Sequence, residues 1–265
     1  PVVTPQTPLL RCLEEMYRAG FRASLVAKAG KLAGIVSFHD IADYLGGGSR
    51  YRVVVERYGG NVYKALSIPS QELMSRDVVS LSIDDTLTRV LELMVTLGIG
   101  LVPILDPGGG IAGVVTEGSI VRMYAKRVGR KPVGEVMTRS LITARDDSPL
   151  SEVLKLMVST GVRRVPLLSS DGRLSGVVTW RGIVEFLGSH RVFGYSRSGA
   201  VGEVLELRAS GLANRDVIVV EPGLPLETLV EMMYERNLDY GLVAEGELLR
   251  GIVTERDIMY AVIGS

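Results

Sequence analysis

The chain has 265 residues, 46% of them hydrophobic, and its formal net charge is zero. This balance excludes bulk attraction to nucleic acid or to an anionic membrane as the basis of function. No apolar run approaches the roughly 18–20 residues of a membrane span, and we expect no signal peptide, so the predicted location is cytoplasmic. The single cysteine, Cys12, cannot form an internal disulfide and is interpreted as a small core residue.

The elements expected at the start of the chain are a strand, an amphipathic helix, two strands and a second helix. Hydrophobic spacing and turn residues place them at 2–4, 9–20, 22–27, 32–37 and 41–45. The Gly-rich run 46–49 is interpreted as a linker, because no Gly-Lys-Ser/Thr follows it to make a phosphate loop. The Arg- and Tyr-rich segment 50–64 is expected to be a connecting helix or strand.

The same order of elements recurs three more times along the chain. In each copy the first helix leucine and the residue that ends the helix are 11 residues apart, in the pairs Leu9 and Gly20, Leu87 and Gly98, Leu150 and Gly161, and Leu226 and Asn237. First strands are expected at 78–80, 141–143 and 217–220. A constant spacing over four copies indicates an internal repeat of roughly 60 residues.

A strand runs into a helix at the same point of each copy, with a hydroxyl residue at the junction. The junctions span 34–41, 113–120, 176–183 and 251–258, and they place Ser37, Thr116, Thr179 and Thr254 in the N-cap position. Asp40 and Asp257 follow their hydroxyl residue by three positions, whereas Ser119 and Gly182 take that place in the second and third copies. The first and fourth junctions therefore differ in chemistry from the other two.

The junction offers groups that can bind a nucleotide. Helix N–H groups favour a phosphate, the hydroxyl can donate to an anion, and an Asp one turn later can accept both hydroxyls of a ribose. Apolar strands on either side provide a slot for a flat base. A structural role explains the same residues, because Thr254 can be a plain N-cap and the helix dipole favours Asp257 without any ligand.

The repeat resembles the cystathionine β-synthase domain, or CBS domain, over nearly the whole chain. The resemblance rests on the junction motif, the constant spacings and the apolar-Pro strands with Val102-Pro103 and Val165-Pro166. It implies an α/β fold of four βαββα units at 1–48, 70–128, 131–188 and 203–265. These units are expected to pair into pseudo-twofold modules at 1–128 and 129–265, stacked as a disc, in a layout similar to the γ subunit of AMP-activated protein kinase.

The resemblance also implies a ligand and its contacts. The family holds AMP, ADP or ATP with Ser/Thr-x-x-Asp, which corresponds here to Ser37, Asp40, Thr254 and Asp257, and no metal is required. Thr116 and Thr179 match only the hydroxyl. Base-binding positions correspond to Thr4, Arg22, Ala23, Val219 and Tyr240. Candidate phosphate cations are Arg22, His39, Arg163, Arg164 and Arg256, although Arg163 and Arg164 can equally form a solvated strand face.

We expect an adenine-nucleotide-binding regulatory protein without a catalytic domain, a monomer or homodimer that acts on an unknown partner protein. An enzyme is the first alternative, but the sequence carries no metal-ligand spacing, nucleophile elbow or Walker loop. A scaffold with vestigial sites is the second, and our argument against it is that packing requires neither Asp40 nor Asp257. A third alternative keeps the fold with S-adenosylmethionine, NAD or nucleic acid as the ligand.

Overall fold

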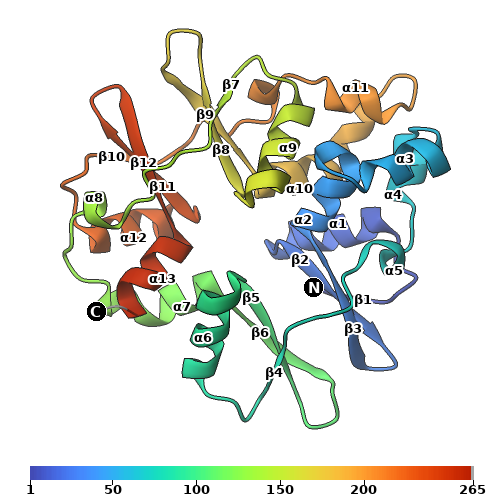
Figure 1. The fold of residues 1–265 in the computed structure, drawn as a ribbon, viewed down its shortest axis with the longest axis horizontal. Helices are drawn as coiled ribbons and strands as arrows, with labels where there is room; N and C mark the ends of the chain where they lie inside the picture. The colour runs from blue at the N-terminus through green and yellow to red at the C-terminus, as the bar shows by residue number, and fades with distance from the viewer. Residues whose placement is uncertain (264–265) are drawn as a thin grey trace. The chain divides into compact units, whose positions relative to one another are not determined.

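The fold is α/β, as expected, in a computed structural model that describes residues 1–263. Among these residues the strands form four three-stranded sheets (Figure 1). In every sheet the first strand is parallel to the middle strand, and the third strand is antiparallel to it. Each sheet comes from one repeat, so the predicted order of strand, helix, strand, strand and helix is confirmed in all four copies.

The five elements of each repeat follow one another without interruption. Repeat 1 contains β1 (Val2–Val3), α1 (Leu9–Ala19), β2 (Ala23–Lys28), β3 (Lys31–Ser37) and α2 (Phe38–Ala42). Repeat 2 contains β4 (Leu81–Ser82), α6 (Leu87–Leu97), β5 (Leu101–Leu105), β6 (Ile111–Thr116) and α7 (Glu117–Tyr124). Repeat 3 contains β7 (Ala144–Arg145), α9 (Leu150–Thr160), β8 (Arg164–Leu168), β9 (Leu174–Thr179) and α10 (Trp180–Gly188). Repeat 4 contains β10 (Val219–Val220), α12 (Leu226–Glu235), β11 (Tyr240–Glu245), β12 (Leu248–Thr254) and α13 (Glu255–Ile263).

The first helix of every repeat ends near a residue with left-handed backbone, at the position that the spacing predicted. The φ angles are 66° at Gly20, 64° at Gly98, 72° at Gly161 and 51° at Asn237. Glycine has no Cβ to clash in this region, and asparagine tolerates it better than most side chains. The Gly or Asn that recurs in the sequence is therefore explained by the backbone turn that sends the chain into the middle strand.

The predicted first strands are partly wrong. β4 and β7 begin at Leu81 and Ala144, after the residues 78–80 and 141–143 expected to form them, whereas β10 lies within the expected 217–220. Pairing with the middle strand fixes these short strands, because Leu81 lies opposite Ile104 and Ala144 opposite Leu167. A two-residue strand has too little sequence of its own to specify that register.

The four repeats group into two compact units that combine segments far apart in sequence. Unit 1 comprises Pro1–Val78 and Ile142–Arg215 and so holds repeats 1 and 3, while unit 2 comprises Val79–Leu141 and Asp216–Ser265 and holds repeats 2 and 4. Each unit has its own buried apolar core. The expected modules 1–128 and 129–265 each draw residues from both units, so that pairing stays a prediction.

Helices between the repeats complete both units. Unit 1 contains α3 (Tyr51–Tyr58), α4 (Val62–Leu66), α5 (Ser70–Leu73) and α11 (Val201–Leu205), and unit 2 contains α8 (Val133–Val136). Within residues 1–263 no helix is long and apolar enough to span a bilayer. The Arg- and Tyr-rich segment 50–64 is thus helical, one of the two forms expected for it.

The interpretation of residues 46–49 as a linker is wrong. A π-helical turn at Asp43–Gly47 continues α2, and Gly46 and Gly47 are buried. A Cβ on Gly47 would lie 2.7 Å from the carbonyl oxygen of Leu154 in α9. Because only glycine permits this close approach, the run packs repeat 1 against repeat 3 inside unit 1.

Segments that lead into one repeat form β-bridges with the last strand of another repeat. Ser75 pairs with Ile35, Thr138 with Ile252 and Asn214 with Val177. Two of these bridges bring a methionine onto the motif glycine, since a Cβ on Gly34 or Gly251 would lie 2.6 Å from the sulfur of Met74 or Met137. At Gly34 and Gly251 the neighbouring segment therefore leaves no room for a side chain, because the backbone oxygens of Ser75 and Thr138 would also lie 2.9 Å from such a Cβ.

We predict that the Cys12 thiol is unreactive in the native protein. Cys12 lies in α1 with no exposed surface, and burial raises the pKa of its thiol to about 12. At pH 8 the thiolate population should then be about a thousandfold lower than in the unfolded chain. Labelling by a disulfide reagent, followed in buffer and in denaturing urea, tests this, because Cys12 is the only cysteine. Fast stoichiometric labelling in buffer would contradict the core assignment.

Candidate functional site

The hydroxyl and acid of repeat 1 form a capping box at the start of α2. The Ser37 side chain accepts from the Asp40 N–H at 3.2 Å, and the Ser37 N–H donates to Asp40 Oδ2 at 2.9 Å. The Ser37 hydroxyl also donates to the same oxygen. These bonds satisfy N–H groups that an α-helix leaves unpaired at its first turn. The predicted N-cap role of Ser37 is confirmed.

Two further side chains reach the second oxygen of Asp40. Arg50 Nη1 donates to Asp40 Oδ1 at 3.0 Å, and the Ser75 hydroxyl donates to it at 3.2 Å. Arg50 also donates to the Leu73 carbonyl at 2.9 Å, and Asp40 is only 6% exposed. The argument that packing does not require Asp40 is therefore wrong, because this carboxylate joins α2 to two connecting segments.

The acid of repeat 4 has a simpler environment. The Thr254 N–H and hydroxyl donate to Asp257 Oδ2 at 2.7 and 2.6 Å, and the Thr138 hydroxyl donates to Asp257 Oδ1 at 2.8 Å. Thr138 thus takes the place that Ser75 has in repeat 1. Asp257 is partly exposed and has no ion pair within the described chain. This junction keeps a charged acceptor that a ligand can reach.

The other two junctions keep the hydroxyl and lack the acid. Thr116 and Ser119 form a capping box through their hydroxyls, which lie 2.8 Å apart, at the start of α7. Thr179 accepts from the Gly182 N–H at 3.0 Å at the start of α10. Both residues are N-caps, as predicted, and neither junction presents a carboxylate in the position of Asp40 or Asp257.

Strand pairing places two of the predicted base-binding residues beside the hydroxyls. Ala23 lies opposite Ser37 across β2 and β3, and Tyr240 lies opposite Thr254 across β11 and β12. Val219 lies in β10, where it pairs with Leu242 and is 47% exposed. Thr4 bonds to Thr7 through its N–H and hydroxyl, so its side chain serves the turn before α1.

The backbone brings one predicted phosphate cation next to each junction of unit 1. The backbone N–H of the residue after the hydroxyl donates to the backbone carbonyl of the residue before the middle strand. Phe38 donates in this way to Arg22 at 2.8 Å, and Trp180 donates to Arg163 at 2.9 Å. In unit 2 the same bonds run from Glu117 to Gly100 and from Glu255 to Asp239. Unit 1 therefore carries an arginine where unit 2 carries a glycine and an acid.

The remaining predicted cations differ in exposure. His39 is exposed on α2, while Arg164 is buried and lies opposite Thr179 across β8 and β9. The interpretation of Arg163 and Arg164 as a solvated strand face is therefore wrong for Arg164. Trp180, the first residue of α10, is 4% exposed and therefore packs in the core.

Arg256 is held by an acid that sequence reasoning missed. Its Nε donates to Glu117 Oε1 at 2.7 Å, and its Nη2 donates to the Gly98 carbonyl at 2.7 Å. Glu117 is the first residue of α7 and is 1% exposed. The pair ties the start of α13 to the start of α7 inside unit 2. An anionic ligand that used Arg256 would have to compete with this carboxylate.

Sequence reasoning also missed Ser75, Thr138 and Arg50. A signal for the first two was present, because Met74-Ser75-Arg76 and Met137-Thr138-Arg139 repeat the same pattern at corresponding positions. No comparable signal existed for Arg50, which lies in the connecting segment directly before α3. Within the described chain, no group of three or more His, Cys, Asp or Glu residues could hold a metal ion.

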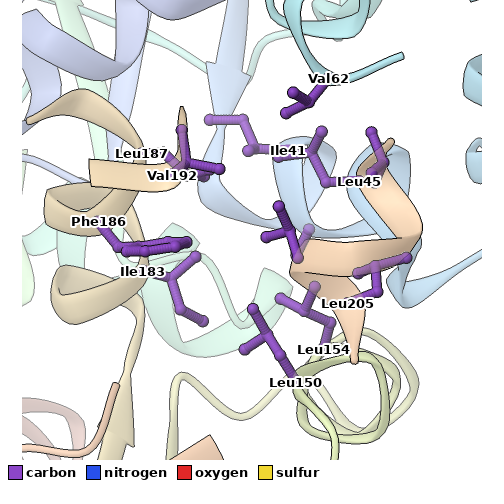
Figure 2. Close-up of a pocket in the computed structure, with 13 residues that line it drawn as sticks. Ile41, Leu45, Val62, Leu150, Leu154, Ile183, Phe186, Leu187, Val192 and Leu205 are labelled. Atoms are coloured by element: carbon purple, nitrogen blue, oxygen red, sulfur yellow. The ribbon is translucent and has the colours of Figure 1, made fainter. Parts of the chain in front are cut away.

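A pocket in unit 1 is unsuited to a nucleotide. It lies between the helices of repeats 1 and 3, where Ile41 and Leu45 face Leu150, Leu154 and Phe186 (Figure 2). All of its lining residues are apolar. Without a donor or acceptor it cannot bind a phosphate or a ribose, and we interpret it as imperfect packing of the core.

Comparison with known proteins identifies the repeated unit. The model of the CBS domain family matches residues 1–47, 70–126, 133–189 and 209–264. A protein of Methanocaldococcus jannaschii, MJ1225, is 30% identical over 261 residues, which cover 97% of this chain and 93% of the relative. A 33.4 kDa protein in the ribosomal RNA operon of Thermofilum pendens is 31% identical over 260 residues, covering 97% of this chain and 86% of the relative.

Two solved structures match the chain over most of its length. The crystal structure of MJ1225, which is described as a candidate archaeal homologue of γ-AMPK, matches with a TM-score of 0.91 and 29% identity over 98% of this chain and 95% of that chain. A conserved protein from Pyrococcus horikoshii matches with a TM-score of 0.56 and 22% identity over 91% of each chain. The second likeness concerns the fold alone.

We predict that Glu117→Ala lowers the free energy of unfolding by about 2 kcal/mol, because it leaves the Arg256 charge without its buried partner. The Arg256 side chain is about one-third exposed, and contact with solvent limits this loss. Glu227→Ala is the matched control, since Glu227 pairs with Arg130, their side chains are 40% and 83% exposed, and such pairs contribute at most about 1 kcal/mol. Urea unfolding of both variants measures the difference. Equal midpoints would contradict a structural role for the Glu117–Arg256 pair.

Proposed function

The chain belongs to the CBS domain family, and on that premise we propose that it is a regulatory protein that binds an adenine nucleotide at its first and fourth junctions. CBS domains typically bind adenosyl ligands. AMP, ADP or ATP is the proposed ligand, and another adenosyl compound such as S-adenosylmethionine or NAD is the alternative. The bound nucleotide would report on the energy state of the cell to a partner protein.

One observation carries this proposal. At the fourth junction a partly exposed carboxylate, which has no ion pair within the described residues, lies beside a hydroxyl at the start of a nine-residue helix, next to apolar strands. A carboxylate in this position can accept ribose hydroxyls, and the helix start favours a nearby phosphate. Asp257 is the acid and Thr254 the hydroxyl in this role. Asp40 and Ser37 have the corresponding roles at the first junction.

The relatives support a regulatory role rather than catalysis. MJ1225 matches this chain over nearly its whole length and is described as a candidate homologue of γ-AMPK. The family model covers all four repeats and leaves only short connecting segments between them. A non-enzymatic protein is therefore proposed, which acts through a change in its own conformation when the ligand binds.

A scaffold without ligand is the second candidate, and the Asp40 network favours it at the first junction. Both oxygens of Asp40 already bond to protein groups, so this acid has a structural reason to be present. Asp257 lacks an ion pair of that kind within the described residues. The fourth junction consequently separates the two candidates better than the first.

We predict that adenine nucleotide raises the melting temperature of the protein. Binding to the native state alone stabilises it by RT ln(1 + [L]/Kd), about 2.7 kcal/mol at a hundredfold excess over Kd. Melting curves with millimolar AMP, ADP, ATP and S-adenosylmethionine, with inosine monophosphate as the control for the base, measure this shift. Mass spectrometry of small molecules released from the purified protein identifies a ligand that it already carries. Curves that overlay the ligand-free curve for all adenosyl compounds would contradict the proposed function.

A further inference from the structure

The carboxylates of Asp40 and Asp257 differ in how many of their acceptor positions the protein fills. An ionised carboxylate offers about four lone-pair positions on its two oxygens. Asp40 accepts four hydrogen bonds, from the Ser37 N–H and hydroxyl, from Arg50 and from Ser75. Asp257 accepts three, from the Thr254 N–H and hydroxyl and from Thr138. Among the described residues, only Asp257 of the two acids therefore keeps a position for a further donor.

Burial and charge reinforce this difference. Asp40 is 6% exposed, whereas Asp257 is partly exposed. The Arg50 guanidinium compensates the charge of Asp40, and no described cation lies within ion-pair distance of Asp257. A ribose hydroxyl can therefore add to Asp257 without breaking a protein contact, but at Asp40 it must displace Arg50 or Ser75.

We propose that Arg50 and the ribose of an adenosyl ligand compete for Asp40, so that the fourth junction fills first and the first junction fills only when Arg50 is released. This inference rests on the function proposed above and ranks its two sites. Arg50 determines which site is available, and it acts through Asp40 rather than as the residue that recognises the ligand. Displacement of Arg50 would also free its bond to the Leu73 carbonyl at the end of α5. Occupation of the first junction is in this way coupled to the connecting segments on both sides of Arg50.

The test is the stoichiometry of AMP binding to the full chain, measured by isothermal titration calorimetry. The wild-type protein should bind one AMP tightly. Asp257→Asn should weaken that event tenfold to a hundredfold, the cost of losing a charged acceptor. Asp40→Asn should leave the tight site unchanged, although it should lower the melting temperature because it weakens the network around α2.

Removal of Arg50 should open the second site. Arg50→Met should add a second AMP per chain, and the double variant with Asp40→Asn should lose it again. Arg52→Met is the matched control, because Arg52 is a nearby exposed arginine that pairs with the exposed Glu56, and it should keep a stoichiometry of one. If Arg50→Met does not fold, Ser75→Ala replaces it, since it vacates one acceptor position on Asp40 Oδ1 and keeps the Arg50 ion pair. Ser75→Ala should then bind a second AMP with lower affinity than the first.

A comparison of ligands shows whether the ribose makes the contact. Adenosine and 2′,3′-dideoxyadenosine should differ tenfold or more in affinity for the wild-type protein and should bind alike to Asp257→Asn. Loss of a tight site in Asp40→Asn, or unchanged binding in Asp257→Asn, overturns the ranking of the sites. A second site that is absent from both Arg50→Met and Ser75→Ala overturns the competition. If no adenosyl ligand binds the wild-type protein or any variant, the proposed function itself is overturned. Failure of the competition and failure of the proposed function are therefore distinguishable.

Discussion

Each complete junction depends on a hydrogen bond from a hydroxyl that comes from elsewhere in the chain. Ser75 donates to Asp40 and Thr138 donates to Asp257, across 35 and 119 residues of sequence. The same carboxylates cap their own helices through the residue three positions earlier. Local helix capping and long-range assembly therefore meet on a single side chain, so that one acid can serve the fold and, in the proposed function, a ligand as well.

The chain around each acid decides which of these roles dominates. A buried carboxylate is tolerated when it is paired and fully hydrogen-bonded, and Arg50 together with the two serines meets that requirement at Asp40. At Asp257 the protein leaves part of the carboxylate in contact with solvent. Arg256, which precedes Asp257 in the sequence, instead pairs with Glu117. Two copies of one motif thus have different chemistry because of residues outside the motif.

The sequence predicted the repeated parts of the fold well and the unique parts poorly. The spacing of leucine and glycine located the first helix of every repeat, because helix periodicity and left-handed helix ends leave local signals. The N-cap positions of Ser37, Thr116 and Thr179 followed from the same local chemistry.

The two-residue strands β4 and β7 were misplaced, since their register is set by a partner strand. Residues 46–49 were misread because composition alone does not distinguish a flexible glycine run from one required by close packing with α9. At the candidate site, the motif supplied the acids and hydroxyls, but the ion pairs of Arg50 and Glu117 depend on contacts between distant segments.

The bridges made by the leading segments have a consequence for dividing the chain into pieces. A fragment that ends before residue 70 would lose Met74 and Ser75, and a fragment that begins at residue 203 would lack Met137 and Thr138. In each case the backbone groups of Ile35 or Ile252 that bond to the missing segment would face solvent on an outer strand. Unpaired strand edges of this kind recruit other chains and promote aggregation. A single repeat is therefore not the smallest piece of this protein suited to expression alone. A soluble fragment must also contain the leading segment that pairs with the outer strand of its sheet.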